Sequence, residues 1–219
     1  MKNLFIILFI SLFNAAFSQT IEEIDSVSNV MCDYLKNLRI KNDTVKMNVL
    51  YQNQLFPYLS TIEPSKTEKI GQQVYFRLQR NCVEFRNILD KIEPPKEGVV
   101  RITEKPKSKI SAEDLMKFKE RNEFYYFEVA GDTTFVKMQN GNWVDSFTNK
   151  TFSNLTYNWI NETEFELVFV ESNNESRSNF SIKGDKIVYQ VLSKEDGYYI
   201  MTLNIPGQST FEKFKLHYK

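Results

Sequence analysis

The run Thr163–Val170 (TEFELVFV) shows the clearest alternation of apolar and polar side chains in the chain. In a strand, this period of two places Phe165, Leu167 and Phe169 on one face of the pleat. Three large apolar side chains on one face are stable only when that face is buried. The run therefore predicts a strand whose one face belongs to a hydrophobic core.

Eight further strand candidates surround this run in the C-terminal part of the chain. They are residues 124–129, 134–139, 142–147, 152–159, 179–182, 186–192, 198–205 and 211–218. Turn residues separate them: Asn140-Gly141 fits a type I′ hairpin turn, and Asp196-Gly197 is a common turn dipeptide. The wholly polar segment 172–178 is expected to be a loop. Short turns between successive strands predict an antiparallel meander.

A meander of this size leaves two long edges if it stays flat, and exposed edges pair with other chains. We therefore expect closure into a small barrel or a strongly curled half-barrel, with a two-sheet sandwich as the alternative. Alternation along the strands predicts which side chains fill the interior. They are Val136, Met138, Trp143, Leu155, Tyr157, Trp159, Phe165, Leu167, Phe169, Ile187, Tyr189, Val191, Tyr199, Met201, Leu203, Phe214, Leu216 and Tyr218.

Three helices are predicted before the sheet. Capping boxes begin the first at Thr20 and the third at Ser65, and Asp43 is the expected N-cap of the second. Apolar residues recur at helical spacing along all three, and Pro57 is expected to kink the second. The third is expected to run unbroken to the prolines that end the helical region. Short connections favour antiparallel neighbours in a small bundle.

A lysine-rich and proline-containing segment joins the two parts. The segment Glu93–Lys109 fits a solvated linker, and the alternative is a basic docking strip formed by Lys105, Lys107 and Lys109. Ser111 followed by Asp114 then begins a short helix. The predicted organisation is α+β, with a signal peptide at 1–18, a three-helix region at 19–95, a linker with a short helix at 96–122 and an antiparallel β domain at 123–219.

The first residues have the features of a secretory signal peptide. Lys2 precedes the apolar run Leu4–Phe13, and the residues up to Ser18 provide a cleavage site. The apolar run is too short to span a bilayer. Because no cysteine follows Ser18 directly, there is no acceptor for a lipid anchor. We expect the mature protein to be secreted or periplasmic, with no integral membrane segment.

Two cysteines, Cys32 and Cys82, follow the predicted cleavage site, and an exported protein enters an oxidising compartment. Both lie on or beside the apolar stripes of predicted helices that would pack together. A disulfide is the simplest interpretation, and the alternatives are a reactive thiol or a metal ligand. Zinc sites usually take four nitrogen or sulfur ligands, whereas the only histidine is His217, near the other end of the chain. We therefore expect no metal site.

The composition and the motifs of the chain argue against several classes of binding and catalytic function. Basic and acidic residues are equal at 28 each, so no net field would attract nucleic acid or an anionic membrane. The chain has no glycine-rich phosphate or dinucleotide motif, and no cofactor is expected. Glu164 and Glu166 share a strand face, but the alternation directs both outward to solvent. No catalytic residue is therefore predicted.

Several segments resemble small exported proteins of Flavobacteria and their relatives. These segments are Ile70-Gly71, Asn81–Phe85, Tyr157–Leu167 and Gly184-Asp185. The β part of such proteins is similar to lipocalin-like domains. The resemblance implies export and a lipocalin-like C-terminal barrel, and it carries over no functional residue.

These observations favour a non-catalytic exported binding or interaction protein. Trp143, Tyr157 and Trp159 are the predicted ligand-binding residues, because a narrow barrel filled with aromatic side chains leaves room for a small apolar ligand at its mouth. The predicted partner is such a ligand or an envelope protein. The alternative function is a carboxylate-dependent hydrolase that acts on extracellular glycans through two acidic residues.

Overall fold

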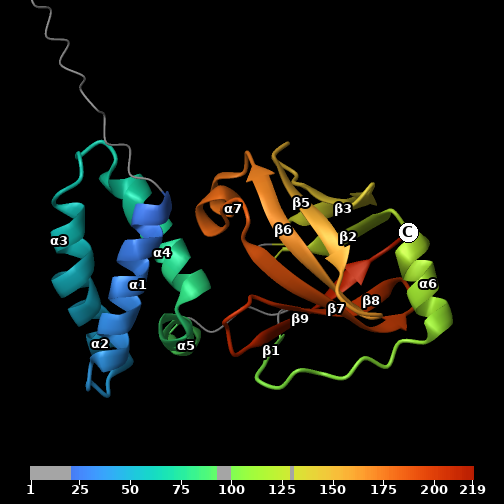
Figure 1. The fold of residues 1–219 in the computed structure, drawn as a ribbon, viewed down its shortest axis with the longest axis horizontal. Helices are drawn as coiled ribbons and strands as arrows, with labels where there is room; N and C mark the ends of the chain where they lie inside the picture. The colour runs from blue at the N-terminus through green and yellow to red at the C-terminus, as the bar shows by residue number, and fades with distance from the viewer. Residues whose placement is uncertain (1–20, 93–99, 129–130) are drawn as a thin grey trace, which may run out of the picture.

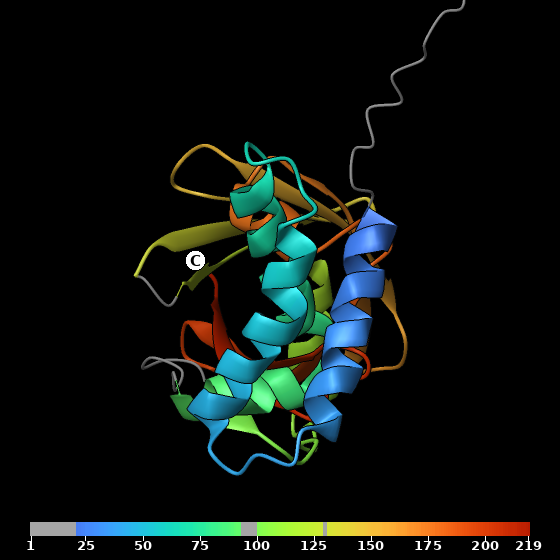
Figure 2. The same cartoon turned by 90° about the vertical axis from the view of Figure 1, so that its left-hand side faces the viewer.

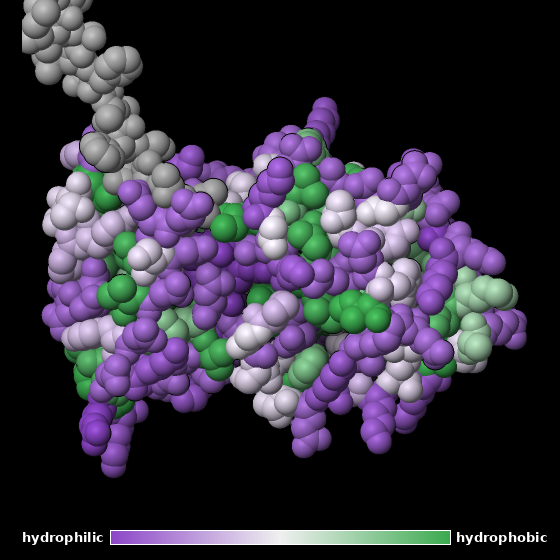
Figure 3. Space-filling model, viewed as in Figure 1, coloured by the Kyte–Doolittle hydropathy of each residue, from purple (hydrophilic) through white to green (hydrophobic). Residues whose placement is uncertain are grey.

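The computed structural model describes residues 21–92, 100–128 and 131–219. Figure 1 shows a group of helices at one side, a β-barrel in the middle and a short helix across the far end of the barrel. The predicted signal peptide and its neighbour Thr20 lie outside the described residues. Among the helices that the structure describes, none has both the length and the apolar content of a membrane span. Polar side chains cover most of the face shown in Figure 3.

The N-terminal helices enclose one hydrophobic core. Their bounds are α1 Ile21–Asn37, α2 Asp43–Leu50, the π-helical η1 Tyr51–Leu55, α3 Phe56–Leu59, α4 Thr67–Asn81 and α5 Val83–Ile92. Helix α1 packs along α4, and Figure 2 shows α1 beside the continuous stretch from α2 to α3. Side chains at the predicted helical spacing form the core, and Leu35, Val74 and Phe85 are fully buried in it.

The prediction of an unbroken third helix is wrong. Cys82 separates α4 from α5, and its backbone is extended, with φ −118° and ψ 105°. The amide of Cys82 still donates to the carbonyl of Leu78 at 2.9 Å, so α4 ends with its last hydrogen bond made. The apolar spacing continues across this break, and the pattern therefore gives no sign of it.

Two helix starts differ from the predicted ones. Asn42, and not Asp43, is the N-cap of α2, because its side chain accepts a hydrogen bond from the amide of Val45 at 3.0 Å. Ser65 does not cap α4. Its hydroxyl donates to Glu63 at 2.6 Å, and the helix begins at Thr67.

The chain widens into a π-helical turn before Pro57. In this turn the amide of Phe56 donates to the carbonyl of Tyr51, five residues back. Proline lacks an amide hydrogen and clashes with the carbonyl of the preceding turn, and a wider turn relieves that clash. The predicted kink is thus a local π turn, and helix α3 continues after it.

The C-terminal part is a closed antiparallel barrel, as predicted, and neither a half-barrel nor a sandwich. Its eight strands are β2 Glu123–Phe127, β3 Thr133–Gln139, β4 Asn142–Ser146, β5 Phe152–Trp159, β6 Glu164–Ser172, β7 Lys186–Glu195, β8 Tyr198–Asn204 and β9 Phe211–His217. Each strand pairs with the next along the chain. The pair Tyr125–His217 joins β2 to β9 and closes the barrel.

Two elements differ from the predicted meander. The segment predicted as a loop and then a strand, 172–182, contains helix α7, Glu175–Phe180. Asn174 starts this helix by accepting a hydrogen bond from the amide of Arg177 at 3.2 Å. The predicted linker contains a short strand, β1 Val100–Ile102, which pairs with β9. Both elements are too short to give a periodic pattern in the sequence.

The predicted inward side chains do form the interior of the barrel. Helix α6, Ala112–Glu120, closes one end of the barrel by inserting Phe118, which is fully buried. The ring centroid of Phe118 lies 5.1 Å from that of Phe124, 5.0 Å from that of Tyr199 and 6.1 Å from that of Trp159. The apolar side of this short helix is therefore part of the core.

Buried ion pairs join the helices to the barrel. Arg77 of α4 donates to Asp25 of α1 at 2.8 Å and also pairs with Asp185, in the turn before β7. Arg80 donates to the backbone carbonyl of Lys186 at 2.8 Å. Both arginine residues are 3% exposed, so these pairs fix the orientation of the helices against the barrel.

Candidate functional site

A cavity of about 290 Å³ occupies the barrel end opposite α6. Most strands of the barrel contribute to its lining, and those of its residues that belong to β5 and β6 lie away from Trp159 and Phe165, the residues of these strands that contact α6. Helix α7 and two residues of the N-terminal helices, Phe76 and Arg86, complete its lining. The cavity therefore lies where the barrel faces the helices, the arrangement seen in Figure 1.

Apolar and polar residues line the cavity in nearly equal numbers, eight and nine. The apolar lining consists of Phe76, Leu155, Leu167, Phe169, Phe180, Ile187, Leu203 and Ile205. The polar lining consists of Arg86, Tyr126, Asp145, Ser153, Ser176, Arg177, Ser181, Tyr189 and Glu212. This lining suits a small ligand that has both an apolar part and a polar group, because polar side chains can orient the one while the apolar side chains contact the other.

Asp145 is the most deeply buried carboxylate of the cavity. In β4 the inward positions are Trp143 and Asp145, and Asp145 is only 8% exposed. The indole nitrogen of Trp143 donates to its Oδ1 at 2.8 Å. Burial raises the pKa of Asp145 to about 6, although the hydrogen bond from Trp143 opposes the rise. The sequence reasoning missed Asp145; an acidic residue at an inward position of a strand is the signal that marks it.

Two tyrosine residues accompany Asp145 in the cavity lining. They are Tyr126 of β2 and Tyr189 of β7, and each packs on Phe214, with ring centroids 6.2 Å and 5.8 Å apart. Burial, and secondly the charge of Asp145, raises the pKa of both hydroxyls. Both hydroxyls therefore stay protonated at neutral pH and can donate or accept a hydrogen bond.

The other charged groups of the cavity are ion-paired. Arg177 of α7 pairs with Glu128, which also accepts a hydrogen bond from the hydroxyl of Thr134 at 2.7 Å. Glu212 of β9 accepts from Arg86 at 2.7 Å and from Arg101 at 3.0 Å. Arg86, Arg177 and Glu212 therefore each have a partner of opposite charge.

The structure separates the three predicted ligand-binding residues. Trp143 is next to the cavity, through its hydrogen bond to Asp145, but it does not line it. Tyr157 packs in the barrel interior against Phe165, with ring centroids 6.4 Å apart. Trp159 lies at the opposite end, where the ammonium of Lys119 sits 4.1 Å from its ring centroid. Ligand binding by these three residues stays a prediction.

The two glutamates predicted to face solvent have different surroundings. Glu164 is only 8% exposed, because it accepts a hydrogen bond from Asn161 at 2.6 Å and pairs with Lys105. Its predicted solvent exposure is therefore wrong. Glu166 is half-buried and pairs with Lys186 at 3.1 Å. Neither glutamate lines the cavity.

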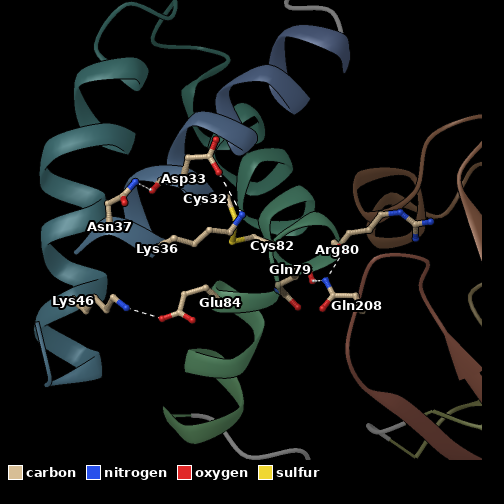
Figure 4. Close-up of a disulfide and its surroundings, with 10 residues drawn as sticks. All are labelled: Cys32, Asp33, Lys36, Asn37, Lys46, Gln79, Arg80, Cys82, Glu84 and Gln208. Carbon is tan, nitrogen blue, oxygen red and sulfur yellow. Dashed lines mark hydrogen bonds and ion pairs between the residues drawn. A yellow bond between two sulfur atoms is a disulfide. The ribbon is translucent and has the colours of Figure 1, made fainter. Parts of the chain in front are cut away.

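The disulfide between Cys32 and Cys82 is present, as predicted. It joins α1 to the α4–α5 junction, with the α-carbons 5.6 Å apart (Figure 4). Just beyond the junction, Lys46 of α2 donates to Glu84 of α5 at 2.6 Å. The described residues contain no group of three or more histidine, cysteine, aspartate or glutamate side chains placed to hold a metal ion.

A larger hollow, of about 650 Å³, lies over the outer side of β2 and β3. Phe124 and Val136 are the buried members of its lining, and both are apolar. Its charged members, such as Glu123 and Lys137, are exposed to solvent. The smaller internal cavity is the better candidate site, because it contains buried polar groups.

Comparisons of the chain with protein-family models, with curated proteins and with solved structures found no match. The function is therefore argued from the cavity.

Proposed function

We propose that this protein is an exported, non-catalytic binding protein that holds a small, largely apolar ligand in the barrel cavity. The observation that carries this proposal is the cavity itself, about 290 Å³ with eight apolar residues in its lining. That volume corresponds to about ten water molecules at the density of the liquid. Removal of water from the apolar side chains is favourable, so these side chains favour contact with an apolar ligand over contact with water.

Other features support export of the protein and a lipocalin-like architecture. The apolar N-terminal run of the sequence supports export, and the disulfide suits a secreted or periplasmic protein. The closed barrel and the apolar core of the helices support a lipocalin-like domain preceded by a helical bundle. The resemblance to small flavobacterial exported proteins fits both export and a lipocalin-like domain. An envelope protein is the alternative partner.

Filling the cavity is expected to weaken ligand binding at least tenfold. Leu203 lines the cavity, and the larger ring of Leu203→Trp would occupy part of the space. Ile200→Trp is the matched control, because Ile200 lies on the same strand and alternates to its outer face. Binding of fatty acids, alcohols and amines would be followed by isothermal titration calorimetry. Equal affinities for Leu203→Trp and the wild type would refute a ligand site in this cavity.

The alternative function is a carboxylate-dependent hydrolase of extracellular glycans. It is favoured by the presence of two carboxylates, Asp145 and Glu212, in one cavity and by the raised pKa of Asp145, which suits a general acid. Hydrolysis of chromogenic glycosides by the wild type, abolished in both Asp145→Asn and Glu212→Gln, would establish it. Rates equal in all three proteins would exclude this pair as the catalytic acids.

A further inference from the structure

Asp145 is the one charged side chain of the cavity lining without a charged partner within the described part of the chain. Arg177 is paired with Glu128. Glu212 is paired with Arg86 and Arg101. A buried carboxylate without a positive partner is unfavourable, because the apolar surroundings replace the water that would solvate it.

The hydrogen bonds of Asp145 are also incomplete. An ionised carboxylate has about four acceptor positions. Among the described side chains, only Trp143 donates a hydrogen bond to Asp145, and it does so to Oδ1. The hydroxyls of Tyr126 and Tyr189 make no side-chain hydrogen bond within the same part of the chain, although both residues line the cavity. Asp145 therefore keeps free acceptor positions, and the two tyrosine hydroxyls can each donate or accept a further hydrogen bond.

An ammonium group has the chemistry that this site lacks. It brings one positive charge and three hydrogen-bond donors, and it accepts nothing. A carboxylate ligand would repel Asp145, and a neutral alcohol would leave its charge uncompensated. The charge of Arg177 lowers the pKa of Asp145, but the ion-pair partner of its guanidinium is Glu128, and the guanidinium lies 5.2 Å from the ring centroid of Phe147.

We infer that the ligand is a small organic cation, a primary alkylamine, whose ammonium group binds Asp145 and whose alkyl chain lies against the apolar walls. This inference rests on the binding function proposed above. It specifies the chemical class of the ligand, which the apolar walls alone do not.

The test is a titration of the mature protein at neutral pH with three ligands of one chain length: n-octylamine, 1-octanol and octanoate. Quenching or a spectral shift of Trp143 would report binding, because its indole is bonded to the carboxylate that holds the amine. We expect octylamine to bind at least tenfold more tightly than octanol, and octanoate to bind most weakly. Calorimetry would confirm the affinities.

Asp145→Asn is expected to abolish the preference for octylamine while octanol still binds. Glu166→Gln is the matched control: it removes a carboxylate from the outer face of β6, where Glu166 pairs with Lys186. Equal binding of octylamine and octanol to the wild type, or a preference that survives in Asp145→Asn, would overturn the amine assignment alone. Failure of all three ligands to bind the wild type would overturn both the assignment and the proposed binding function.

Discussion

Replacing both Cys32 and Cys82 by alanine is expected to lower the free energy of unfolding by about 4 kcal/mol. The disulfide closes a loop with a sequence separation of 50 residues, so it restricts the unfolded chain strongly. It also fixes α1 against the break between α4 and α5, where the backbone of Cys82 leaves the helical conformation. Without the bond, α1 is held to α4 by side-chain packing, by the Arg77–Asp25 pair and by the hydrogen bond from Asn81 to Asp25.

Urea denaturation followed by two signals would check this prediction. Far-ultraviolet circular dichroism reports the helices, whereas tryptophan fluorescence reports the barrel, because Trp143 and Trp159 both lie in barrel strands. We expect the unfolding midpoint of the helical signal to shift to a lower urea concentration. The wild type under reducing conditions is the control for lost side-chain packing, and it should lose a similar free energy. Unchanged unfolding midpoints in both proteins would contradict the prediction.

Asp145→Asn is expected to stabilise the protein at pH 7 by up to about 3 kcal/mol. The pKa of Asp145 rises from 3.8 to about 6 on folding, and this difference corresponds to a cost of about 3 kcal/mol for the ionised form. The cost is absent below pH 3.8, where the group is protonated in both states, and it is fully present above about pH 6. Asparagine keeps an acceptor for Trp143 and removes the charge.

The measurement compares unfolding free energies of wild type and Asp145→Asn between pH 4 and pH 7. The difference should be near zero at the acid end and should grow as the pH rises towards 6. Glu128 and Arg177 also act on Asp145, and they are the same in both proteins. Asp196→Asn, at an exposed turn, is the control and should show no such trend. A stability difference independent of pH would contradict the assigned cause.

If Asp145→Asn both stabilises the fold and removes the preference for octylamine, then the ionised Asp145 lowers the stability of the free protein and serves ligand binding. Residues at binding sites often have this property, because a group left without partners in the free protein is available to a ligand. The pH series of unfolding free energies and the titration with the three octyl ligands together distinguish a binding role of Asp145 from a structural role.

The sequence patterns were enough to predict the antiparallel barrel, the Cys32–Cys82 disulfide and the start of helix α6 at Ser111. Alternation in β6 put Phe165, Leu167 and Phe169 inside. The Asn140-Gly141 turn has φ values of 52° and 75°, the positive values that a type I′ hairpin requires. The strands, the turn and the helix start depend on residues close together in the chain, so a local pattern is enough to predict them. The disulfide joins residues with a sequence separation of 50, and its prediction rested on two cysteines in helices that were expected to pack together.

The position of the cavity and the identity of its polar groups could not be predicted from sequence patterns and follow from the three-dimensional packing. Asp145 is buried because β4 faces β7 and α7 across the barrel, and Glu164 is buried because Lys105 and Asn161 cover it. The break at Cys82 likewise lies inside an apolar stripe that reads as one helix. Such features depend on residues far apart in the sequence, and periodicity along the chain contains no information about which distant segments meet.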